Sequence, residues 1–375
     1  MSKKVAIIIS PSWRDYAKKY LADCLESLRG QDWDGDFKIF LVDNESTDES
    51  LALLNNIAET QNPPNPLFER GQIEIIRNKN NDGFAKGNND AMKLALAQGF
   101  DYIVLFNMDT VIEENCVSEL VKVVESENPP NPPFRKGAIG AVQARLMLWP
   151  EKDKINSLGN ITHFLGFGYC LGYNESIQNS KFKIQNSLDV CYPSGAAVLF
   201  KAEVLKKVRL FDEEFWMYNE DQDLGWRIWL AGWRCVLAPE AVVYHKYEFA
   251  KSIKQYYWMD RNRMISVIKN YHWLTLILIT PACFVMELGL LLFSTKTGWF
   301  KEKIKVWFYF LKPRTWQYLI KARGRAQSLR QVKDRDIVKM FTGKIWYQEI
   351  GDWKLRLVNP VFQIYWWVVR KIIFW

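Results

Sequence analysis

The sequence has few histidines and no closely spaced cysteines. Only three histidines and six cysteines occur among its 375 residues. The cysteines are dispersed, without the short spacings of zinc-binding or dithiol redox motifs: Cys24, Cys116, Cys170, Cys191, Cys235 and Cys283. This pattern argues against a cysteine-based metal or redox site, and we interpret the six cysteines as reduced packing residues.

Two further features are missing near the N-terminus. The segment after the first apolar run, residues 10–14, contains no glycine, whereas a Rossmann oxidoreductase needs a Gly-x-Gly-x-x-Gly turn there. The first apolar run, residues 5–9, is too short for the hydrophobic region of a signal peptide. We therefore expect no dinucleotide-dependent oxidoreductase, and we expect the N-terminal part of the chain to stay in the cytosol.

Hydrophobic and aromatic residues are abundant by contrast. They make up 49% and 15% of the chain, and the 17 tryptophans exceed the needs of a core, so we expect an additional interface. The length suits one catalytic domain of about 250 residues and an appendage. We predict a catalytic domain at 1–250, with a nucleotide-binding half at 1–145 and an acceptor half at 146–250, followed by a helical, aromatic and basic region at 251–375.

The apolar pattern of the first half predicts an α/β fold. Short apolar runs at 5–9, 37–42, 73–76 and 102–106 alternate with helix-length amphipathic stretches, as in parallel strands joined by helices. Two nearly identical proline-rich segments, 62–71 and 128–137, fall between a helix and the next strand. Because proline at that density fits neither a helix nor a central strand, we interpret them as inserted surface loops. We also expect a buried strand at 190–200, interrupted by Pro193 and Gly195.

Acidic residues follow two of the predicted strands. Asp43 comes directly after the second strand, where open α/β sheets bind ligands, and can accept hydrogen bonds from a base or ribose. Helix capping explains Ser46, Thr47 and Asp48 equally well, but it does not explain Asp43. Asp109 ends the fourth strand, where a carboxylate can bridge to donor phosphates through Mg²⁺ or Mn²⁺, cations that prefer oxygen ligands.

Glycine and carboxylate clusters provide two more candidate sites. Gly83 and Gly87, after the third strand, permit close approach of the backbone to a nucleotide at a helix start. An acidic and aromatic cluster at 211–224 is the acid/base candidate, because aromatic walls beside carboxylates suit a sugar pocket. A helix N-terminus would by itself favour one or two of these carboxylates. His245 ends a predicted strand, and a lone histidine is usually structural.

Taken in order, these motifs resemble those of the inverting glycosyltransferase family 2, of GT-A fold, and particularly its bacterial rhamnosyltransferase-like members. The resemblance covers residues 4–270 and is carried by segments 42–48, 81–89, 107–109 and 211–224 with Arg227. It departs from the usual pattern at Met108, where proline is common, and at 247–250, where glycines are frequent.

The resemblance implies a role for each motif. Asp43 would contact the nucleotide, Asp109 would bind Mg²⁺ or Mn²⁺, His245 would be a second ligand of the metal or diphosphate, and Asp221 would be the general base. The substrate-binding residues expected with them are Pro11, Asp43, Asn81, Gly83, Lys86, Asn88, Asn107, Gly195, Glu220 and Arg227. We expect like charges and burial to raise the pKa of a base beside Glu220 and Asp223.

The expected function is inverting transfer of a sugar from a nucleotide-diphosphate donor, such as dTDP-rhamnose or a UDP-sugar. The acceptor would be a glycan or lipid-linked glycan in cell-surface polysaccharide synthesis. The alternative is a catalytically inactive, membrane-bound module that binds nucleotide-sugars or glycans.

The C-terminal region predicts attachment to the cytoplasmic face of a membrane. The chain has a formal charge of +8, and its basic residues concentrate in this region. Apolar runs interleave with these cations. This combination favours anionic lipid over nucleic acid as the partner. Residues 274–293 are long enough for a borderline span, but the lysines and arginines that follow disfavour a simple one. With Pro281 and Glu287 inside it, we expect a monotopic or re-entrant segment, anchored by Trp299, Trp307, Trp316, Trp366 and Trp367. A helical bundle packed on the catalytic domain is the alternative.

Overall fold

A computed structural model describes most of the chain: residues 3–10, 16–46, 50–60, 72–126, 137–178, 188–246, 253–346 and 353–375. Pro11 lies outside the described residues. So do segment 62–71, nearly all of segment 128–137, and residues 247–250.

The centre of the molecule is a mixed β-sheet of ten strands in the described part of the chain, in the order β10-β12-β6-β11-β4-β1-β2-β3, with β5 paired to β12 and β7 to β6. The strands are β1 (Val5–Ile9), β2 (Phe37–Asn44), β3 (Gln72–Asn78), β4 (Tyr102–Phe106), β5 (Thr110–Ile112), β6 (Ile139–Leu148), β7 (Ile155–Ser157), β10 (Leu188–Asp189), β11 (Ala197–Lys201) and β12 (Arg234–His245). A separate hairpin joins β8 (Asn160–Thr162) and β9 (Gly168–Cys170).

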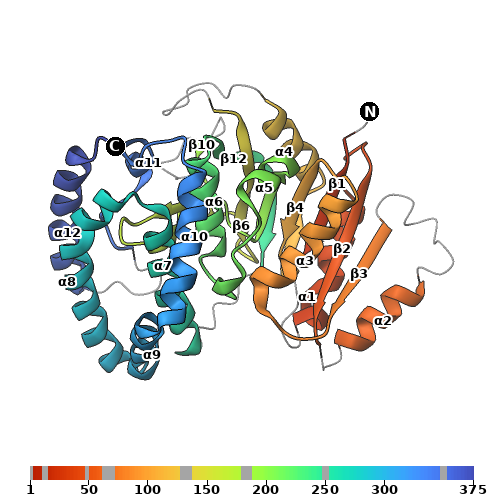
Figure 1. Ribbon diagram of the computed structural model, residues 1–375. Helices are drawn as coiled ribbons and strands as arrows, with labels where there is room; N and C mark the ends of the chain where they lie inside the picture. Colours follow the sequence, from red (N-terminus) through yellow and green to blue (C-terminus); the bar gives the residue numbers. More distant parts are fainter. Residues whose placement is uncertain are drawn as a thin grey trace.

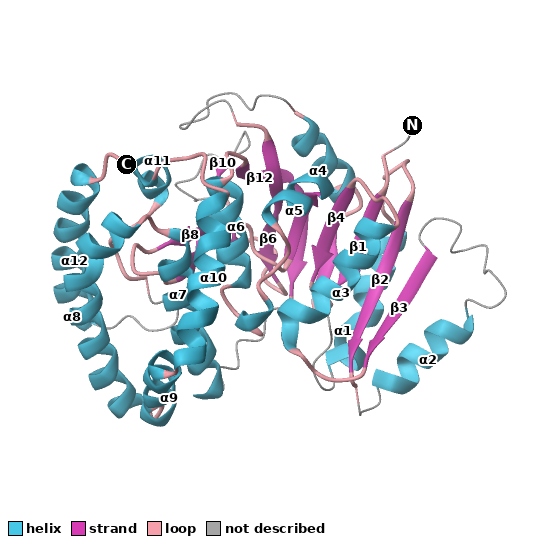
Figure 2. Ribbon diagram, viewed as in Figure 1, coloured by secondary structure: helices cyan, strands magenta, loops and turns pink. Residues whose placement is uncertain are grey.

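Helices cover both faces of this sheet and continue into a C-terminal group (Figures 1 and 2). The helices are α1 (Tyr16–Arg29), α2 (Ser50–Thr60), α3 (Gly83–Ala97), α4 (Cys116–Glu125), α5 (Ala202–Val208), α6 (Glu220–Leu230), α7 (Ile253–Asn270), α8 (Trp273–Thr297), α9 (Phe300–Leu311), α10 (Pro313–Ser328), α11 (Asp334–Ile337) and α12 (Trp353–Ile372), with 3-10 turns at Glu213–Phe215 and Val338–Met340. Side chains of α3, α5 and α6 belong to the core on one face, and those of α1, α2 and α4 to the core on the other.

The four strands expected in the first half are confirmed. They pair in parallel, with β1 between β2 and β4, and β1 is buried throughout because both faces are covered. The strand expected at 190–200 is shorter, since β11 begins at Ala197. Pro193 has no N–H to donate, and the N–H groups of Ser194 and Gly195 donate to the side chains of Gln143 and Asp221 instead of to a neighbouring strand.

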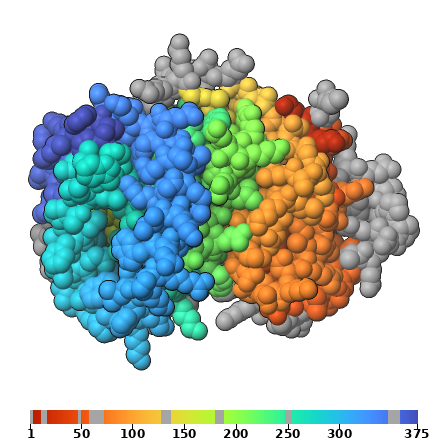
Figure 3. Space-filling model, in the orientation of Figure 1, coloured from red at the N-terminus to blue at the C-terminus, as the bar shows by residue number. Residues whose placement is uncertain are grey.

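The C-terminal helices pack directly on the rest of the protein. One hydrophobic core contains Trp226 of α6 together with Tyr271 of α7 and Phe341, and Trp366 of α12 stacks on Phe164 with ring centroids 4.7 Å apart. In the space-filling view, α10 lies against the α5 and α6 region without a gap (Figure 3). The division of the chain near residue 250 stays a prediction, and the core continues across it.

Helix α8 is a single 25-residue helix that continues through Pro281. Within the described residues it is the one helix long and apolar enough to cross a membrane. The bend that would turn residues 274–293 back within one leaflet is not present. Two of the expected interfacial anchors are also wrong: Trp299 and Trp366 are only 2% and 3% exposed, because they stack on Tyr256 and Phe164 inside the protein.

Glu287, near the middle of α8, lies in a buried cluster of charges. Its carboxylate accepts from Arg263 of α7, from Lys303 of α9 at 2.6 Å and from Trp307 Nε1 at 3.0 Å. Asp260 of α7 completes the cluster, with Lys303 at 2.7 Å. Burial alone would raise the pKa of Glu287, but the charges of Arg263 and Lys303 outweigh it and lower the pKa to about 2. The cluster therefore ties α8 and α9 to α7.

Candidate active site

Two predicted acidic residues follow strands that end on the same edge of the sheet. Asp43 is in β2 near its end, is 3% exposed, and accepts from the backbone N–H of Ser46 at 3.0 Å. Asp109 comes shortly after the end of β4. Because β2, β1 and β4 run in parallel and in register, their carboxyl ends form one edge, the position at which open α/β sheets bind ligands.

Pairing between β5 and β12 places His245 opposite Thr110, next to Asp109. His245 Nε2 is 3.3 Å from Asp109 Oδ1. On the other side of the ring, Nδ1 is 3.1 Å from Asn156 Oδ1, which can only accept, so Nδ1 donates to it and the ring is held in this orientation. Nε2 then faces the carboxylate of Asp109.

The donor atoms around Asp109 fit a divalent cation. Nε2 of His245 and a carboxylate oxygen of Asp109 converge, and the buried Oδ1 of Asn107 has no hydrogen-bond partner among the described residues. Within those residues no group of three or more histidine, cysteine, aspartate or glutamate side chains is placed to hold a metal ion. The protein thus offers fewer ligands than a closed metal site, which is the situation of Mg²⁺ sites completed by substrate phosphates and water.

The start of α3 lies beside the end of β2. Asn44, next to Asp43, donates from Nδ2 to the carbonyl of Gly83 at 3.0 Å, and Asn81 Oδ1 accepts from the N–H of Gly83 at 3.2 Å. Gly83 has φ +87°, and a Cβ atom there would lie 2.5 Å from Trp216. The turn therefore requires glycine, for its conformation and for the close approach of Trp216.

Two other predicted residues of α3 are engaged within the protein. Asn88 is fully buried, donates from Nδ2 to the carbonyl of Phe84 at 2.9 Å, and lies 3.5 Å from the hydroxyl of Ser10 at the end of β1. Lys86 pairs with Asp90 at 3.0 Å and Asp82 at 3.3 Å, which raise its pKa. Lys86 is thus held by two carboxylates, that of Asp90 in α3 and that of the N-cap residue Asp82.

Asp221 lies at the N-terminus of α6, and its carboxylate is held by backbone N–H groups. It accepts from Gly195 at 3.3 Å and from Gln222 at 2.7 Å. The residue after Gly195, Ala196, accepts from the backbone of Asn107 at 3.0 Å, so the end of β4 and the N-terminus of α6 meet through this segment. Phe84 of α3 also contacts Gly195. The structure thus brings Asp221, Gly195, Asn107 and the start of α3 together.

Burial raises the pKa of Asp221 to about 6, although its hydrogen bonds from Gly195 and Gln222 oppose the shift. Its neighbour Glu220 is 6% exposed, and burial together with the charge of Asp221 raises the pKa of Glu220 well above its usual value. Two adjacent carboxyl groups cannot easily ionise together in such a site. Ionisation of one therefore opposes ionisation of the other, and Glu220 has the surroundings less favourable to a charge.

Arg227 and Asp223 are bound inside the protein. Arg227 donates to Asp223 at 2.9 Å and to the carbonyls of Val208, Arg209 and Leu210 at 2.5–3.1 Å. Asp223 is fully buried and also pairs with Lys269 of α7 at 3.0 Å. These contacts anchor α6. The assignment of Arg227 to substrate binding stays a prediction, and its described contacts are structural.

The sequence reasoning missed residues that support the site from a distance. Asn156 fixes the ring of His245, and Asn262 and Lys269 of α7 bind the segment before α6 and α6 itself. A lone asparagine or lysine in the sequence gives no signal of such a contact. Asp260, Arg261, Asn262 and Arg263 are consecutive polar residues, so they point to different sides of α7. This run is a local sign that the helix makes polar contacts on more than one side.

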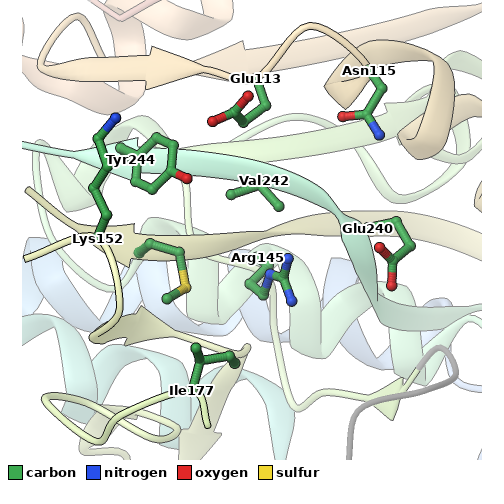
Figure 4. Close-up of a pocket in the computed structure, with 9 residues that line it drawn as sticks. Glu113, Asn115, Arg145, Lys152, Ile177, Glu240, Val242 and Tyr244 are labelled. Carbon is green, nitrogen blue, oxygen red and sulfur yellow. The ribbon is translucent and has the colours of Figure 1, made fainter.

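A separate cavity of about 300 Å³ lies beside β6, β12 and the start of α4 (Figure 4). It contains none of the predicted site residues. Arg145, Lys152 and Tyr244 line it together with Glu113 and Glu240. Tyr244 and His245 are successive residues of one strand, so they project to opposite faces, and the cavity is on the other side of β12 from the Asp109–His245 pair.

Comparisons with known proteins agree with this geometry. The description "Glycosyl transferase family 2" matches residues 7–183, and "Glycosyl transferase family group 2" matches residues 102–312. An N-acetylglucosaminyl-diphospho-decaprenol L-rhamnosyltransferase of Mycobacterium tuberculosis is 44% identical over 52 residues, 14% of this chain and 17% of that relative. The chain thus spans a small part of the length of the curated relatives it matches.

Two solved structures share the fold. A structure of GalNAc-T7 with UDP, GalNAc and Mn²⁺ has a TM-score of 0.51 at 12% identity, covering 71% of this chain and 48% of that one. S. aureus TarS 1-349 in complex with UDP-GlcNAc has a TM-score of 0.50 at 15% identity, covering 98% and 90%. The mixed sheet with helices on both faces is accordingly the GT-A fold.

The fold and the site at the carboxyl ends of the parallel strands together define a glycosyltransferase. The match to residues 102–312 covers more than half of the chain, and it crosses residue 250 into α7, α8 and α9. The protein belongs to glycosyltransferase family 2.

Proposed function

We propose that this glycosyltransferase moves a sugar from a nucleotide-diphosphate donor to a hydroxyl group of a glycan or lipid-linked glycan, with inversion at the anomeric carbon. The observation that carries the proposal is the convergence, on one edge of the sheet, of the Asp109–His245 pair and of Asp221 with its raised pKa. Family 2 membership and the UDP and UDP-GlcNAc held by structures of the same fold support a nucleotide-sugar donor.

Asp109 and His245 would hold Mg²⁺ or Mn²⁺, and the Mn²⁺ in the GalNAc-T7 structure supports a divalent cation. When bound, the cation neutralises the charge that develops on the departing nucleoside diphosphate. Asp43, Asn81, Gly83, Lys86, Asn88 and Asn107 are proposed to contact the donor. His245 keeps its ring orientation through Asn156, which fixes the tautomer that faces Asp109.

Asp221 is proposed to take the proton from the acceptor hydroxyl. The acceptor oxygen forms a bond to the anomeric carbon as the bond from that carbon to the diphosphate oxygen breaks on the opposite side, which inverts the configuration. A carboxylate of pKa about 6 is ionised at neutral pH and is a stronger base than an ordinary aspartate. Gly195 and Glu220 are proposed to shape the acceptor site around it.

The donor sugar is proposed from the relatives. The short match to a rhamnosyltransferase favours dTDP-rhamnose, and the structures of the same fold favour a UDP-sugar. The same rhamnosyltransferase acts on a lipid-linked substrate by its name, which supports a role in cell-surface polysaccharide synthesis. The rival function, an inactive nucleotide-sugar or glycan-binding module, requires lost chemistry. Asp109, Asp221 and His245 argue against it.

Purified protein should be screened for nucleoside diphosphate release from dTDP-rhamnose and a panel of UDP-sugars, with and without lipid-linked acceptors. Acceptor-dependent release from one donor, absent in Asp109→Ala, is the expected result. Tight donor binding without release in any combination would instead support the binding module.

We further propose attachment to the cytoplasmic face of the membrane through α8 and α12. The two helices lie side by side at the left edge of Figure 1, and both carry exposed apolar side chains. They include Ile277, Phe284, Leu288 and Leu292 of α8, and Val361, Ile364, Val368 and Ile372 of α12, all more than 40% exposed. Large exposed apolar patches mark sites of membrane or protein interaction.

The packing around α8 argues for a monotopic arrangement rather than a span. α7 precedes α8 and α9 follows it, and Arg263 and Lys303 from these two helices bind the same carboxylate of Glu287. The chain after α8 also returns to the catalytic half, where Gln331 donates to the carbonyl of Leu230 at 2.7 Å. A span would place these partners on opposite sides of the bilayer.

Exposed cations flank the apolar surface and complement anionic lipid: Lys296, Lys301, Lys305, Lys312, Arg314, Lys321 and Arg325. Two other cations of this region, Lys303 and Arg323, point inward and bind Asp260 and the carbonyl of Tyr271. Trp316 and Trp367 are about half exposed and remain interfacial anchors in this proposal.

Membrane attachment is tested by fractionation. The protein should sediment with membranes and resist high salt, and Phe284→Glu combined with Leu292→Glu should release it. Leu51→Glu, at an exposed apolar residue of α2 away from this surface, is the matched control and should stay membrane-bound. Full solubility of the unaltered protein without detergent would contradict the proposal, and so would a C-terminal tag accessible from outside the cell.

A further inference from the structure

The segment just before the N-terminus of α6 has an unusual backbone. Trp216, Tyr218 and Asn219 all have positive φ, at 60°, 67° and 64°, within four residues. None is a glycine, and side chains rarely adopt this conformation without being held there by their surroundings. The segment leads directly into Glu220 and Asp221. We call residues 215–219 the aromatic loop.

Asn262 of α7 binds the backbone of this loop. Its Nδ2 atom lies within hydrogen-bond distance of three carbonyls, those of Phe215 at 2.9 Å, Met217 at 2.8 Å and Tyr218 at 2.8 Å. The amide has two hydrogens, so it is shared among the three acceptors. Asn262 is fully buried, and its Oδ1 accepts from Arg261 Nε at 2.9 Å. One side chain therefore holds carbonyls on both sides of the strained Trp216.

The aromatic loop also touches the proposed donor side of the site. The carbonyl of Trp216 accepts from the N–H of Ala85 at 3.1 Å, and its indole packs against Gly83. On the other face, the ring of Trp216 stacks on Trp258 of α7, with centroids 4.8 Å apart. The loop thus connects the start of α3, the N-terminus of α6 and α7.

One turn of α7 joins this loop to the helices that carry the exposed apolar surface. Asp260 and Arg263 bind Glu287 and Lys303 of α8 and α9, whereas Arg261 and Asn262 bind the loop and its preceding residue Glu214. Of these four consecutive residues, two therefore bind α8 and α9, and the other two bind the aromatic loop and Glu214. Because the α8 and α9 side is fixed by buried ion pairs, Asn262 is presented to the loop from a rigid support.

We propose that Asn262 is a positioning residue: by holding the aromatic loop, it sets the place of Asp221 for the acceptor. This inference rests on the proposed role of Asp221 as the base. Loss of the Asn262 amide releases three carbonyls, so the loop relaxes from its positive-φ conformation and water reaches Glu220 and Asp221. Asp43, Asp109 and His245 at the strand ends are held by contacts that do not involve the loop, so donor binding changes much less than turnover.

The test uses the whole chain with Asn262→Ala, and Asn262→Leu as an uncharged variant of similar size that lacks the amide donors. The matched control is Asn359→Ala. Asn359 of α12 is also a buried asparagine whose side chain holds a backbone segment, at the N–H and carbonyl of Ile345, remote from the site.

The expected result is a fall in kcat of about 10-fold or more in both Asn262 variants, with the KM for donor unchanged within about 2-fold. The acidic limb of the rate–pH profile should move to lower pH, because a hydrated Asp221 returns toward its ordinary pKa. Asn359→Ala should change neither kcat nor the profile. A merely structural role would lower thermal stability in all the variants alike without moving the limb.

Amide hydrogen exchange gives a readout that does not depend on activity. Exchange at Phe215, Trp216 and Met217, whose N–H groups are bonded in the folded protein, should accelerate in the Asn262 variants and not in Asn359→Ala. Unchanged exchange, or an unchanged kcat and pH limb, overturns the positioning role. Near-native transfer by Asp221→Asn would instead show that the base assignment is wrong, which is a separate failure.

Discussion

His245 Nε2 lies 3.3 Å from Asp109 Oδ1, although the two residues are far apart in the sequence. The contact exists because β5 pairs with the last residues of β12, and it is oriented because Asn156 Oδ1 accepts from the opposite ring nitrogen. Two electron-rich atoms facing each other at this distance repel unless a cation or a proton lies between them. This electrostatic requirement is the basis of the first prediction.

Asp109→Asn should abolish metal-dependent transfer. The amide keeps the shape of the side chain but removes the negative charge that would hold Mg²⁺ or Mn²⁺, so we expect a loss of at least about 100-fold in kcat/KM. Steady-state transfer with and without excess chelator is the measurement. Undiminished turnover in the variant, or of the unaltered enzyme in chelator, would show that no metal acts through Asp109.

Asp221→Asn should bind donor normally but transfer sugar at least about 100-fold more slowly, because an amide cannot take the acceptor proton. Donor binding can be followed by calorimetry and turnover by product formation. The variant should also be more stable than the unaltered protein at pH 8. The folded-state pKa of Asp221 is raised, so the stability that this group contributes at low pH is lost as pH rises through about 6. Near-native transfer would move the search for the base to Glu220.

The pH dependence of kcat/KM should show an acidic limb near pH 6. Burial raises the pKa of Asp221 to about 6, and the base acts only when ionised, so the rate should rise with pH through this value and level off above it. The measurement is kcat/KM between pH 5 and 8 at constant ionic strength. A rate that is flat down to pH 5 would mean that no group with this raised pKa limits the reaction.

Gly83→Ala should destabilise the protein more than Gly99→Ala. Both glycines have positive φ, +87° and +78°, so the backbone cost of about 1 kcal/mol applies to each. A Cβ at Gly83 would lie 2.5 Å from Trp216, whereas nothing lies within 4 Å at Gly99. Overpacking should add roughly 1–3 kcal/mol at Gly83 alone. Equal changes in the free energy of unfolding, measured by denaturant titration, would show that Trp216 does not pack there.

Arg227→Met should lower the free energy of unfolding by roughly 1–3 kcal/mol, because it removes one of the two cations that bind Asp223 and the donor to the carbonyls of Val208, Arg209 and Leu210. The variant should keep the donor KM of the unaltered enzyme when assayed at low temperature. Denaturant titration and donor saturation curves measure the two effects. A raised KM with unchanged stability would favour the substrate-binding role expected from the sequence.

The sequence by itself determined the parallel half of the sheet and the identity of the strand-end residues. Apolar runs at β1, β2, β3 and β4 are long and buried on both faces, so hydrophobic periodicity locates them, and Asp43 and Asp109 follow from where those strands end. Local pattern also located the start of α6, where Glu220 and Asp221 combine helix-terminal charge with aromatic neighbours.

The tertiary structure alone decided which of these residues meet. The Asp109–His245 contact depends on an antiparallel pairing between β5 and β12, and the support of the aromatic loop depends on an asparagine in α7. Neither has a local signature, because the stabilising partner is distant in the chain. The same reason explains why Trp299 and Trp366 are core residues and Lys303 is a buried cation. Amphipathic pattern shows that a side chain is apolar or charged, but only packing between helices decides whether it faces another helix or the surface.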